Sequence, residues 1–182
     1  MESVQYAVVA YLRDPVGEFV EGLRREMHPK HAHLPAHISI LPPRPLHGSE
    51  AQALETMEQV CQAVAPFEIT MGEVATFAPT TATVFIRLAH AAYRMRELHD
   101  RLNTGPLRSD EPWPYMPHLT IAKMDSQEES DRVLNEAKRR WDEYSSTRRV
   151  MIDELTFVRQ AGPDRWLDIA PVPLGKRLAP TR

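Results

Sequence analysis

The hydrophobic positions of this chain switch between the two-residue period of strands and the longer period of helices. Residues 3–12, SVQYAVVAYL, are apolar and rich in β-branched and aromatic side chains, so they predict a strand. Asp14 and Pro15 then provide an N-cap and a first helical position, and apolar residues follow at intervals of three or four. This pattern predicts an amphipathic helix that begins beside Asp14.

The same alternation continues through the rest of the first half of the chain. A short strand, HISIL, is expected over 37–41 and is expected to stop at the two prolines that follow, because proline cannot donate to a strand ladder. Ser49 and Gln52 have the spacing of a capping box, which predicts the start of a second helix. Residues 67–77 alternate between apolar and polar side chains, which predicts a third strand.

The second half of the chain repeats this order of elements. Its expected strands and helices are strands over 81–88 and 118–124, helices over 91–103 and from Ser126 onward, and closing strands over 148–160 and 164–172. The sequence therefore predicts an α+β fold with two pseudo-symmetric lobes, each a mainly antiparallel sheet backed by helices.

The length of 182 residues fits a single bilobal domain. We expect the lobes to be formed by the halves 1–78 and 79–172, with 173–182 as a C-terminal tail. A groove between two related lobes is a natural place for a ligand. The active groove is therefore expected between the lobes.

Composition and charge narrow the kinds of partner. The chain is 42% hydrophobic and 26% charged, and its formal net charge of −3 argues against an extended nucleic-acid surface. No apolar run approaches the roughly 20 residues that span a membrane. The single cysteine, Cys61, fits a reducing cytoplasm, and nothing in the sequence demands an oligomer. We expect a cytoplasmic monomer whose partner is small or is presented at a chain end.

Candidate chemistry lies on the middle strand of each half. The tripeptides HIS (from His37) and HLT (from His118) both combine a histidine with a hydroxyl residue two places later. Residues i and i+2 of a strand point to one face, so His37 and Ser39 share a face, as do His118 and Thr120. The apolar residues between them then point to the opposite face, toward the helices.

Two imidazoles and two hydroxyls facing one groove suit a phosphate. The hydroxyls can donate to the non-bridging oxygens, while the imidazoles move protons at the attacking and leaving oxygens. Histidine has an ordinary pKa near 6.5, so one ring can act as base and the other as acid at neutral pH. Neither role requires a metal or another cofactor.

The tripeptide alone is weak evidence, and the alternative is that these are ordinary histidines of the core or the sheet edge. With eight histidines and 19 serines and threonines, about one H-x-[ST] is expected by chance. The shared context is more specific. Both copies follow a proline, lie between apolar residues on a predicted strand, and occupy the same place in each half.

At these two motifs the chain resembles the two-histidine (2H) phosphoesterase superfamily, and within it the bacterial 2′-5′ RNA ligase-like proteins. The resemblance implies metal-independent chemistry on phosphodiesters, such as opening of 2′,3′-cyclic phosphates or reversible joining of RNA ends through a 2′-5′ linkage. It also implies that His37 and His118 are the catalytic acid–base pair and that Ser39 and Thr120 bind the phosphate. For hydrolysis we expect His118 to activate water and His37 to protonate the leaving oxygen; the reverse reaction exchanges these roles.

Four further residues are candidates for substrate binding, each with a plain structural alternative. Arg44 follows the first motif strand and could reach a phosphate or remain a solvated loop residue. Lys123 follows Thr120 by an odd number of positions, so it faces the site only if the strand twists or ends there. Trp113 and Tyr115, in the proline-rich segment before the second motif, could stack on a base or pack under their own loop.

A second group of histidines precedes the first motif. His28, His31 and His33 invite a metal hypothesis, but no cysteine or carboxylate near them in the sequence completes a familiar ligand set. We expect loop residues here and no metal site. The leading hypothesis is thus a phosphoesterase acting on a small nucleotide or an RNA terminus; the alternatives are a nucleotide-binding module without useful catalysis and a histidine-loop metalloprotein.

Overall fold

A computed structural model describes residues 3–176 of the chain. Its strands and α-helices, in chain order, are β1 (Tyr6–Tyr11), α1 (Pro15–Met27), β2 (His37–Arg44), α2 (Glu50–Gln62), β3 (Phe67–Thr76), β4 (Thr83–His90), α3 (Ala92–Leu102), β5 (His118–Lys123), α4 (Gln127–Asp142), β6 (Arg149–Ile152), β7 (Glu154–Gly162) and β8 (Arg165–Pro173). Short 3-10 helices lie at Pro29–His31 and Gly105–Leu107. The predicted α+β order of elements is confirmed in both halves. No helix among these described residues is long and apolar enough to cross a membrane.

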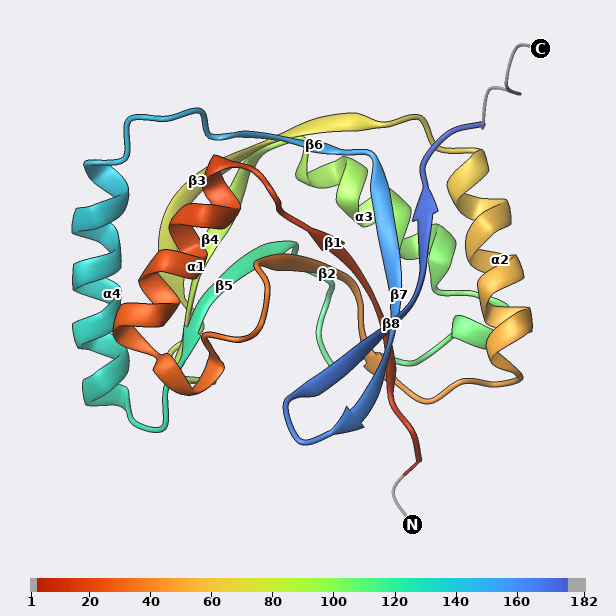
Figure 1. Ribbon diagram of the computed structural model, residues 1–182, viewed down its shortest axis with the longest axis horizontal. Helices are drawn as coiled ribbons and strands as arrows, with labels where there is room; N and C mark the ends of the chain where they lie inside the picture. The colour runs from red at the N-terminus through yellow and green to blue at the C-terminus, as the bar shows by residue number, and fades with distance from the viewer. Residues whose placement is uncertain (1–2, 177–182) are drawn as a thin grey trace.

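The strands form one curved sheet of two four-stranded lobes. Their order is β6-β3-β4-β5-β2-β1-β7-β8, and every pairing is antiparallel. Helices α1 and α4 lie together beside one lobe, and α2 and α3 lie together beside the other (Figure 1). The lobes meet at β2 and β5, the two strands that carry the H-x-[ST] motifs.

The predicted division of the lobes into residues 1–78 and 79–172 is wrong, because the halves exchange elements. Strand β3, from the first half, pairs with β4 and β6 of the second half. Strands β7 and β8, from the second half, extend the lobe of β1. The exchange follows from the short connection between β3 and β4, since consecutive strands usually pair. Of the predicted tail, residues 177–182 lie outside the described residues.

The helix starts follow the signals in the sequence. The Asp14 side chain accepts a hydrogen bond from the Gly17 amide at 3.0 Å, as an N-cap should. Ser49 and Gln52 form the predicted capping box at the start of α2. Ser126 caps α4.

The predicted end of the first motif strand differs from the structure. Strand β2 does not stop at Pro42 and Pro43 but continues to Arg44. It tolerates the prolines because its pairing with β1 is irregular there: between the pairs Val8–Leu41 and Tyr6–Arg44, one residue of β1 faces the two prolines of β2. Such a bulge removes the ladder positions that proline would disrupt.

The predicted strand over 148–160 is two strands in the structure. It divides at Asp153, where β6 ends and β7 begins. Strand β6 pairs with β3 and β7 pairs with β1, so these two consecutive strands belong to different lobes. A continuous β-prone run cannot reveal this division, because both segments satisfy the same two-residue period.

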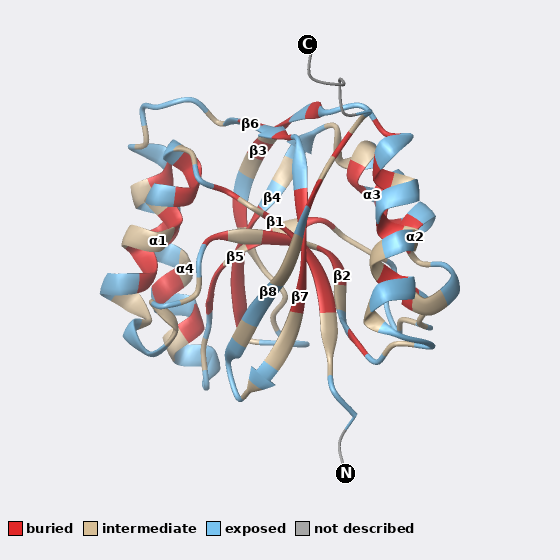
Figure 2. Ribbon diagram, turned by 45° about the vertical axis from the view of Figure 1, so that its right-hand side comes forward, coloured by how far each residue is buried: buried red, intermediate tan, exposed pale blue. Residues whose placement is uncertain are grey.

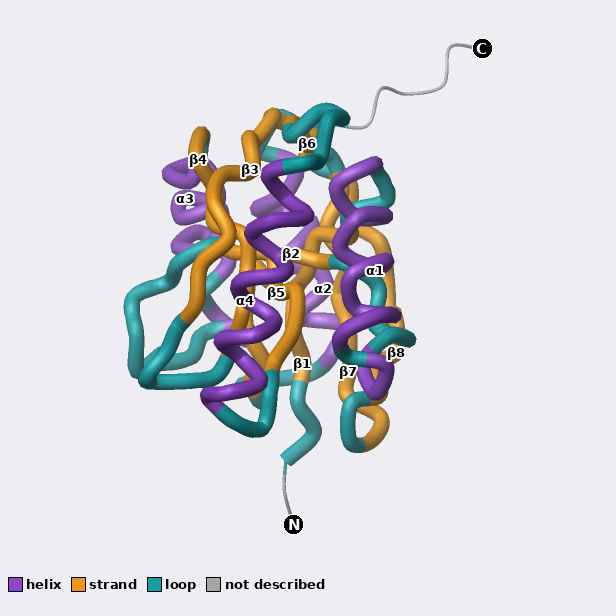
Figure 3. Tube along the Cα trace, turned by 90° about the vertical axis from the view of Figure 1, so that its left-hand side faces the viewer, coloured by secondary structure: helices purple, strands orange, loops and turns teal. Residues whose placement is uncertain are grey.

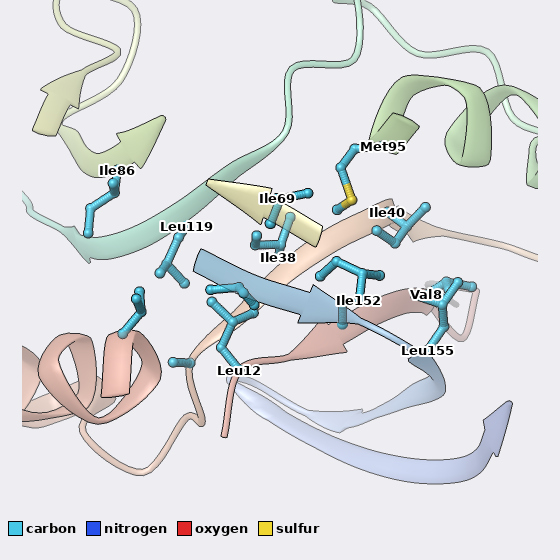
Figure 4. Packing of buried hydrophobic residues seen from close by; sticks show 14 of the residues in the cluster. Val8, Leu12, Ile38, Ile40, Ile69, Ile86, Met95, Leu119, Ile152 and Leu155 are labelled. Carbon is cyan, nitrogen blue, oxygen red and sulfur yellow. The ribbon is translucent and has the colours of Figure 1, made fainter. Parts of the chain in front are cut away.

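The core lies between the sheet and the helices. Ile38, Ile40, Leu119 and Ile121, which alternate with the motif residues, are fully buried. Figure 2 shows buried segments along the strands and along one side of each helix, and Figure 3 shows α1 and α4 side by side. The packing around Ile38 and Leu119 is drawn in Figure 4. Burying each such side chain contributes roughly 1.5–3 kcal/mol, so a one-residue slip that exchanged the two faces would be costly.

Candidate active site

The two motifs lie side by side at the junction of the lobes. Strands β2 and β5 are antiparallel and pair over one residue of each strand, with Ile38 opposite Leu119. Extending this register by one residue in each direction places His37 opposite Thr120 and Ser39 opposite His118. The four side chains are half-buried and share the face turned away from the helices. The structure therefore brings together all four predicted motif residues.

Both catalytic candidates are held by the same local hydrogen bond. Nδ1 of His37 lies 2.8 Å from the Pro35 carbonyl oxygen, and Nδ1 of His118 lies 2.8 Å from the Met116 carbonyl oxygen. A carbonyl can only accept, so Nδ1 carries the proton in each ring. In the neutral ring Nε2 is then the free basic nitrogen, as required for proton transfer to or from a substrate.

The environment favours the neutral form of both rings. Burial lowers the pKa of His37 below its ordinary value, and the charges of Arg24 and His118 lower it further. Burial also lowers the pKa of His118. The carbonyl bonds oppose these shifts without reversing them. An anionic phosphate between the rings would raise both pKa values by favouring the imidazolium forms.

The aromatic surroundings of the two rings differ. His118 lies edge-on to Phe77 and Phe85, with ring centroids 5.0 and 5.3 Å away. His37 faces Tyr11, whose ring centroid is 6.4 Å away. The Tyr11 hydroxyl donates to Asp168 at 2.6 Å, and its pKa is raised by burial and by this carboxylate. Tyr11 is therefore a neutral neighbour of His37.

Arg24 is a positioning residue that was not predicted from the sequence. It is 4% exposed, and its guanidinium donates to the carbonyl oxygens of Leu34, Thr120 and Ile121 at 2.6, 2.6 and 3.1 Å. It thus ties the segment before the first motif to the backbone of the second. Arg24 lies four residues after Val20, on the apolar side of α1, and this spacing could have indicated from the sequence that its side chain is buried.

Tyr115 makes the corresponding contact with the first motif. Its hydroxyl donates to the Ser39 carbonyl oxygen at 2.9 Å. Its ring stacks on His99, with centroids 4.3 Å apart and planes 3° apart. Since His99 covers one face of the ring, the predicted stacking of a base on Tyr115 is limited to the other face.

Arg44 is buried and bonded to other parts of the protein. It is 2% exposed, and its guanidinium donates to the Asn103 side chain at 2.7 Å, to the Leu107 carbonyl at 2.9 Å and to Glu111. Its Nε donates to the Pro42 carbonyl at 3.0 Å. These bonds use four of its five N–H groups and hold the loop before β5. Arg44 also lines the cavity beside His118, so its contact with substrate stays a prediction, and its bonds within the protein show that it holds this loop as well.

The remaining two candidates lie differently with respect to the site. Trp113 is 70% exposed and lines a cavity beside His118. Lys123 is exposed at the end of β5, opposite Thr83, and lines neither of the two cavities at the motifs. The structure thus places Trp113 where a ligand could reach it, while Lys123 lies away from the cavity walls.

Two cavities adjoin the motifs. The His37 cavity, of about 570 Å³, lies against β1 and the β7–β8 hairpin. The His118 cavity, of about 600 Å³, lies against the loop that carries Trp113. Ser39 and Pro43 line both. The site therefore offers space on two sides of a group bound at Ser39.

The histidine cluster forms contacts within the protein. Nδ1 of His31 lies 2.8 Å from Nδ1 of His28, and Nε2 of His31 lies 3.2 Å from an oxygen of Asp164. His33 donates through Nε2 to the Asp164 carbonyl at 3.1 Å. Among residues 3–176, no three histidine, cysteine or carboxylate side chains are grouped so as to hold a metal ion. The cluster joins the loop before the first motif to the β7–β8 turn.

Solved structures share this fold. TT0787 of Thermus thermophilus superimposes with a TM-score of 0.66 at 15% identity, covering 95% of this chain and 100% of that chain. LigT of E. coli, in a complex with NADP+, superimposes with a TM-score of 0.62 at 13% identity, covering 97% and 100%. These likenesses confirm the bilobal α+β fold.

Sequence comparisons identify the family. "Putative phosphoesterase BH1439" of Halalkalibacterium halodurans is 24% identical over 175 residues, covering 95% of this chain and 99% of that protein. Residues 12–164 match the family model described as the 2′-5′ RNA ligase superfamily. This segment contains both H-x-[ST] motifs and most of the fold, so the chain belongs to the 2′-5′ RNA ligase superfamily of 2H phosphoesterases.

Proposed function

We propose that this protein is a metal-independent phosphoesterase that hydrolyses, or reversibly forms, a 2′,3′-cyclic phosphate or a 2′-5′ phosphodiester at an RNA end or in a small nucleotide. One observation carries the proposal. The two motif imidazoles share one face of the sheet, and in each the Nδ1 proton is held by a backbone carbonyl, which leaves Nε2 for the substrate. The matched family supports phosphoesterase chemistry.

The proposed hydrolysis needs two proton transfers. Water attacks the phosphorus of a 2′,3′-cyclic phosphate, one imidazole takes the proton of the water, and a P–O bond to the ribose breaks. The other imidazole donates a proton to the released ribose oxygen, which gives a phosphate monoester. In this proposal the hydroxyls of Ser39 and Thr120 donate to the non-bridging oxygens, where negative charge grows in the transition state.

For hydrolysis we propose the order expected from the sequence, in which His118 activates water and His37 protonates the leaving ribose oxygen. Burial lowers the pKa of both rings, and a bound anionic phosphate favours the protonated form that the acid needs. Formation of the cyclic phosphate uses the same residues in the opposite order.

The test is turnover of the four nucleoside 2′,3′-cyclic monophosphates in the presence of EDTA. We expect wild-type turnover, a loss of at least about 100-fold in kcat for His37→Ala and for His118→Ala, and no change for His90→Ala, an exposed control. A folded protein that binds these nucleotides without turning them over would favour the binding-module alternative. Activity abolished by EDTA would contradict the metal-independent mechanism.

A further inference from the structure

A chain of buried polar contacts runs from the loop before β5 to the first motif. The Glu111 side chain is 15% exposed, and it accepts from Arg44 of β2 and, at 3.0 Å, from Nε2 of His99 on α3. The His99 ring stacks on the Tyr115 ring, and the Tyr115 hydroxyl donates to the Ser39 carbonyl oxygen at 2.9 Å. The proposed proton transfers use neither Glu111 nor His99. These two residues are nevertheless connected to a residue that is proposed to bind the phosphate.

The contacts fix both the plane of the Tyr115 ring and its hydroxyl. His99 is 6% exposed and lies parallel to the ring, with centroids 4.3 Å apart and planes 3° apart. His99 is itself held at both nitrogens, because Nδ1 lies 2.9 Å from an Asp100 oxygen and Nε2 lies 3.0 Å from a Glu111 oxygen. Burial raises the pKa of Tyr115, and the Glu111 carboxylate raises it further. The hydroxyl therefore keeps the proton that it donates to Ser39.

Glu111 is the residue on which the other contacts depend. Among the residues that the structure describes, it is the one carboxylate that forms an ion pair with Arg44, which is 2% exposed. A buried guanidinium needs a charged partner, so this pair fixes where the Glu111 carboxylate lies. The same carboxylate accepts from His99, whose ring covers Tyr115. The position of the Tyr115 ring therefore depends on an ion pair that the fold already requires.

We propose that Glu111 and His99 are positioning residues for phosphate binding, which hold Tyr115 in place so that its hydroxyl fixes the backbone of Ser39. This inference rests on the proposed function, in which the Ser39 hydroxyl donates to a non-bridging oxygen. The bound substrate makes that contact as well as the transition state. A loss of alignment at Ser39 therefore raises KM more than it lowers kcat.

The experiment is a double-mutant cycle on the turnover of 2′,3′-cyclic AMP. Glu111→Gln, which keeps an oxygen for Arg44, and His99→Leu are each made in the wild type and in the Tyr115→Phe protein. We expect each to raise KM about fivefold in the wild type, the equivalent of one neutral hydrogen bond, with a smaller change in kcat. In the Tyr115→Phe protein each should add little, because the hydroxyl through which it acts is already absent. Glu97→Gln, at an exposed ion pair of α3, is the matched control and should change neither constant.

The outcomes separate this inference from the proposed function. Equal effects of Glu111→Gln in the wild type and in the Tyr115→Phe protein would overturn the inference and leave the phosphoesterase intact, since Glu111 would then act directly in the His118 cavity that it lines. If Glu111→Gln does not fold, the same comparison with His99→Leu decides. Absence of turnover of every cyclic nucleotide by the wild type would overturn the proposed function. In that case, amide hydrogen exchange of residues 37–44 tests the positioning alone: faster exchange in Glu111→Gln than in Glu97→Gln supports it, and equal exchange overturns it.

Discussion

The two motifs are alike in their local structure and different in what surrounds them. His37 and His118 hold the same position on β2 and β5 and donate to the carbonyl two residues earlier at the same distance of 2.8 Å. The backbone beside them is held by unrelated side chains. Thr120 accepts from the buried Arg24, whereas Ser39 accepts from the Tyr115 hydroxyl.

The difference shows how the two lobes are kept in register. Strands β2 and β5 pair over a single residue each, so the carbonyls beyond that pair need other donors. Arg24, from the first half, supplies donors to the second motif, and Tyr115, from the second half, supplies one to the first. Arg24 is a charged donor with three bonds and Tyr115 is a neutral donor with one. Removing each donor should therefore lower stability by different amounts, and substitutions at and around the motifs test this difference.

The largest expected effect comes from the catalytic pair. His37→Asn and His118→Asn should each lower kcat at least about 100-fold, because each ring performs one of two coupled proton transfers. The double variant should be little worse than the poorer single variant, since residues that act as a unit give non-additive losses. Steady-state kinetics on 2′,3′-cyclic nucleotides measures this. Fully additive losses would indicate that the two rings act independently.

Arg24→Met should have the next largest effect. It leaves three backbone carbonyls without their charged donor, so we expect a loss of about 3 kcal/mol in the free energy of unfolding, together with a lower kcat. Urea unfolding measures the first quantity. Arg25→Met is the matched control on the same helix, since Arg25 is exposed, and should cost less than about 0.5 kcal/mol. Equal free energies of unfolding for the two variants would show that the bonds of Arg24 to the three carbonyls do not stabilise the fold.

Tyr115→Phe should have a smaller effect, because it removes one neutral donor and keeps the ring against His99. We expect a loss of about 1 kcal/mol in the free energy of unfolding. If the contact positions Ser39, KM for a cyclic nucleotide should rise while kcat changes less. A loss of stability as large as that of Arg24→Met would show that the two contacts are equivalent.

The smallest expected effect is a change in how stability depends on pH. Burial holds the pKa of both motif histidines below the ordinary value, so the unfolded chain binds protons more readily than the folded protein. Stability should therefore fall as the pH decreases from 7 through about 6.5 toward the lowered pKa values. The His37→Asn/His118→Asn protein should lose less stability between pH 7 and pH 5. His47 and His90 are exposed, so replacing them with Asn should leave the wild-type dependence unchanged.

Much of the fold followed from local patterns. Alternation placed the motif residues on one face and Ile38, Ile40, Leu119 and Ile121 in the core, because a strand has a fixed two-residue period. The capping signals at Asp14, Ser49 and Ser126 marked the true starts of three helices, since a cap depends on residues within one turn. The repeated tripeptide correctly indicated the family.

Contacts between distant segments were decided by the tertiary structure. Nothing local distinguishes β6 from β7, and which strands exchange between the lobes depends on pairings far apart in the chain. The burial of Arg44 likewise depends on Asn103 and Glu111, which lie in the second half of the chain. A side chain such as Arg44 can be solvated, bind a ligand or hold a loop, and the donors and acceptors that the fold brings to it determine which.

The sequence by itself determined the order of most strands and helices and the shared face of the motif residues, because period, caps and tripeptides are properties of neighbouring residues. The tertiary structure alone decided that Arg24 and Tyr115 support opposite motifs and that Ser39 stands between two cavities. The two supporting contacts join residues 96 and 76 positions apart in the chain. They are fixed by burial and by the need of each buried carbonyl for a donor, which no local pattern encodes.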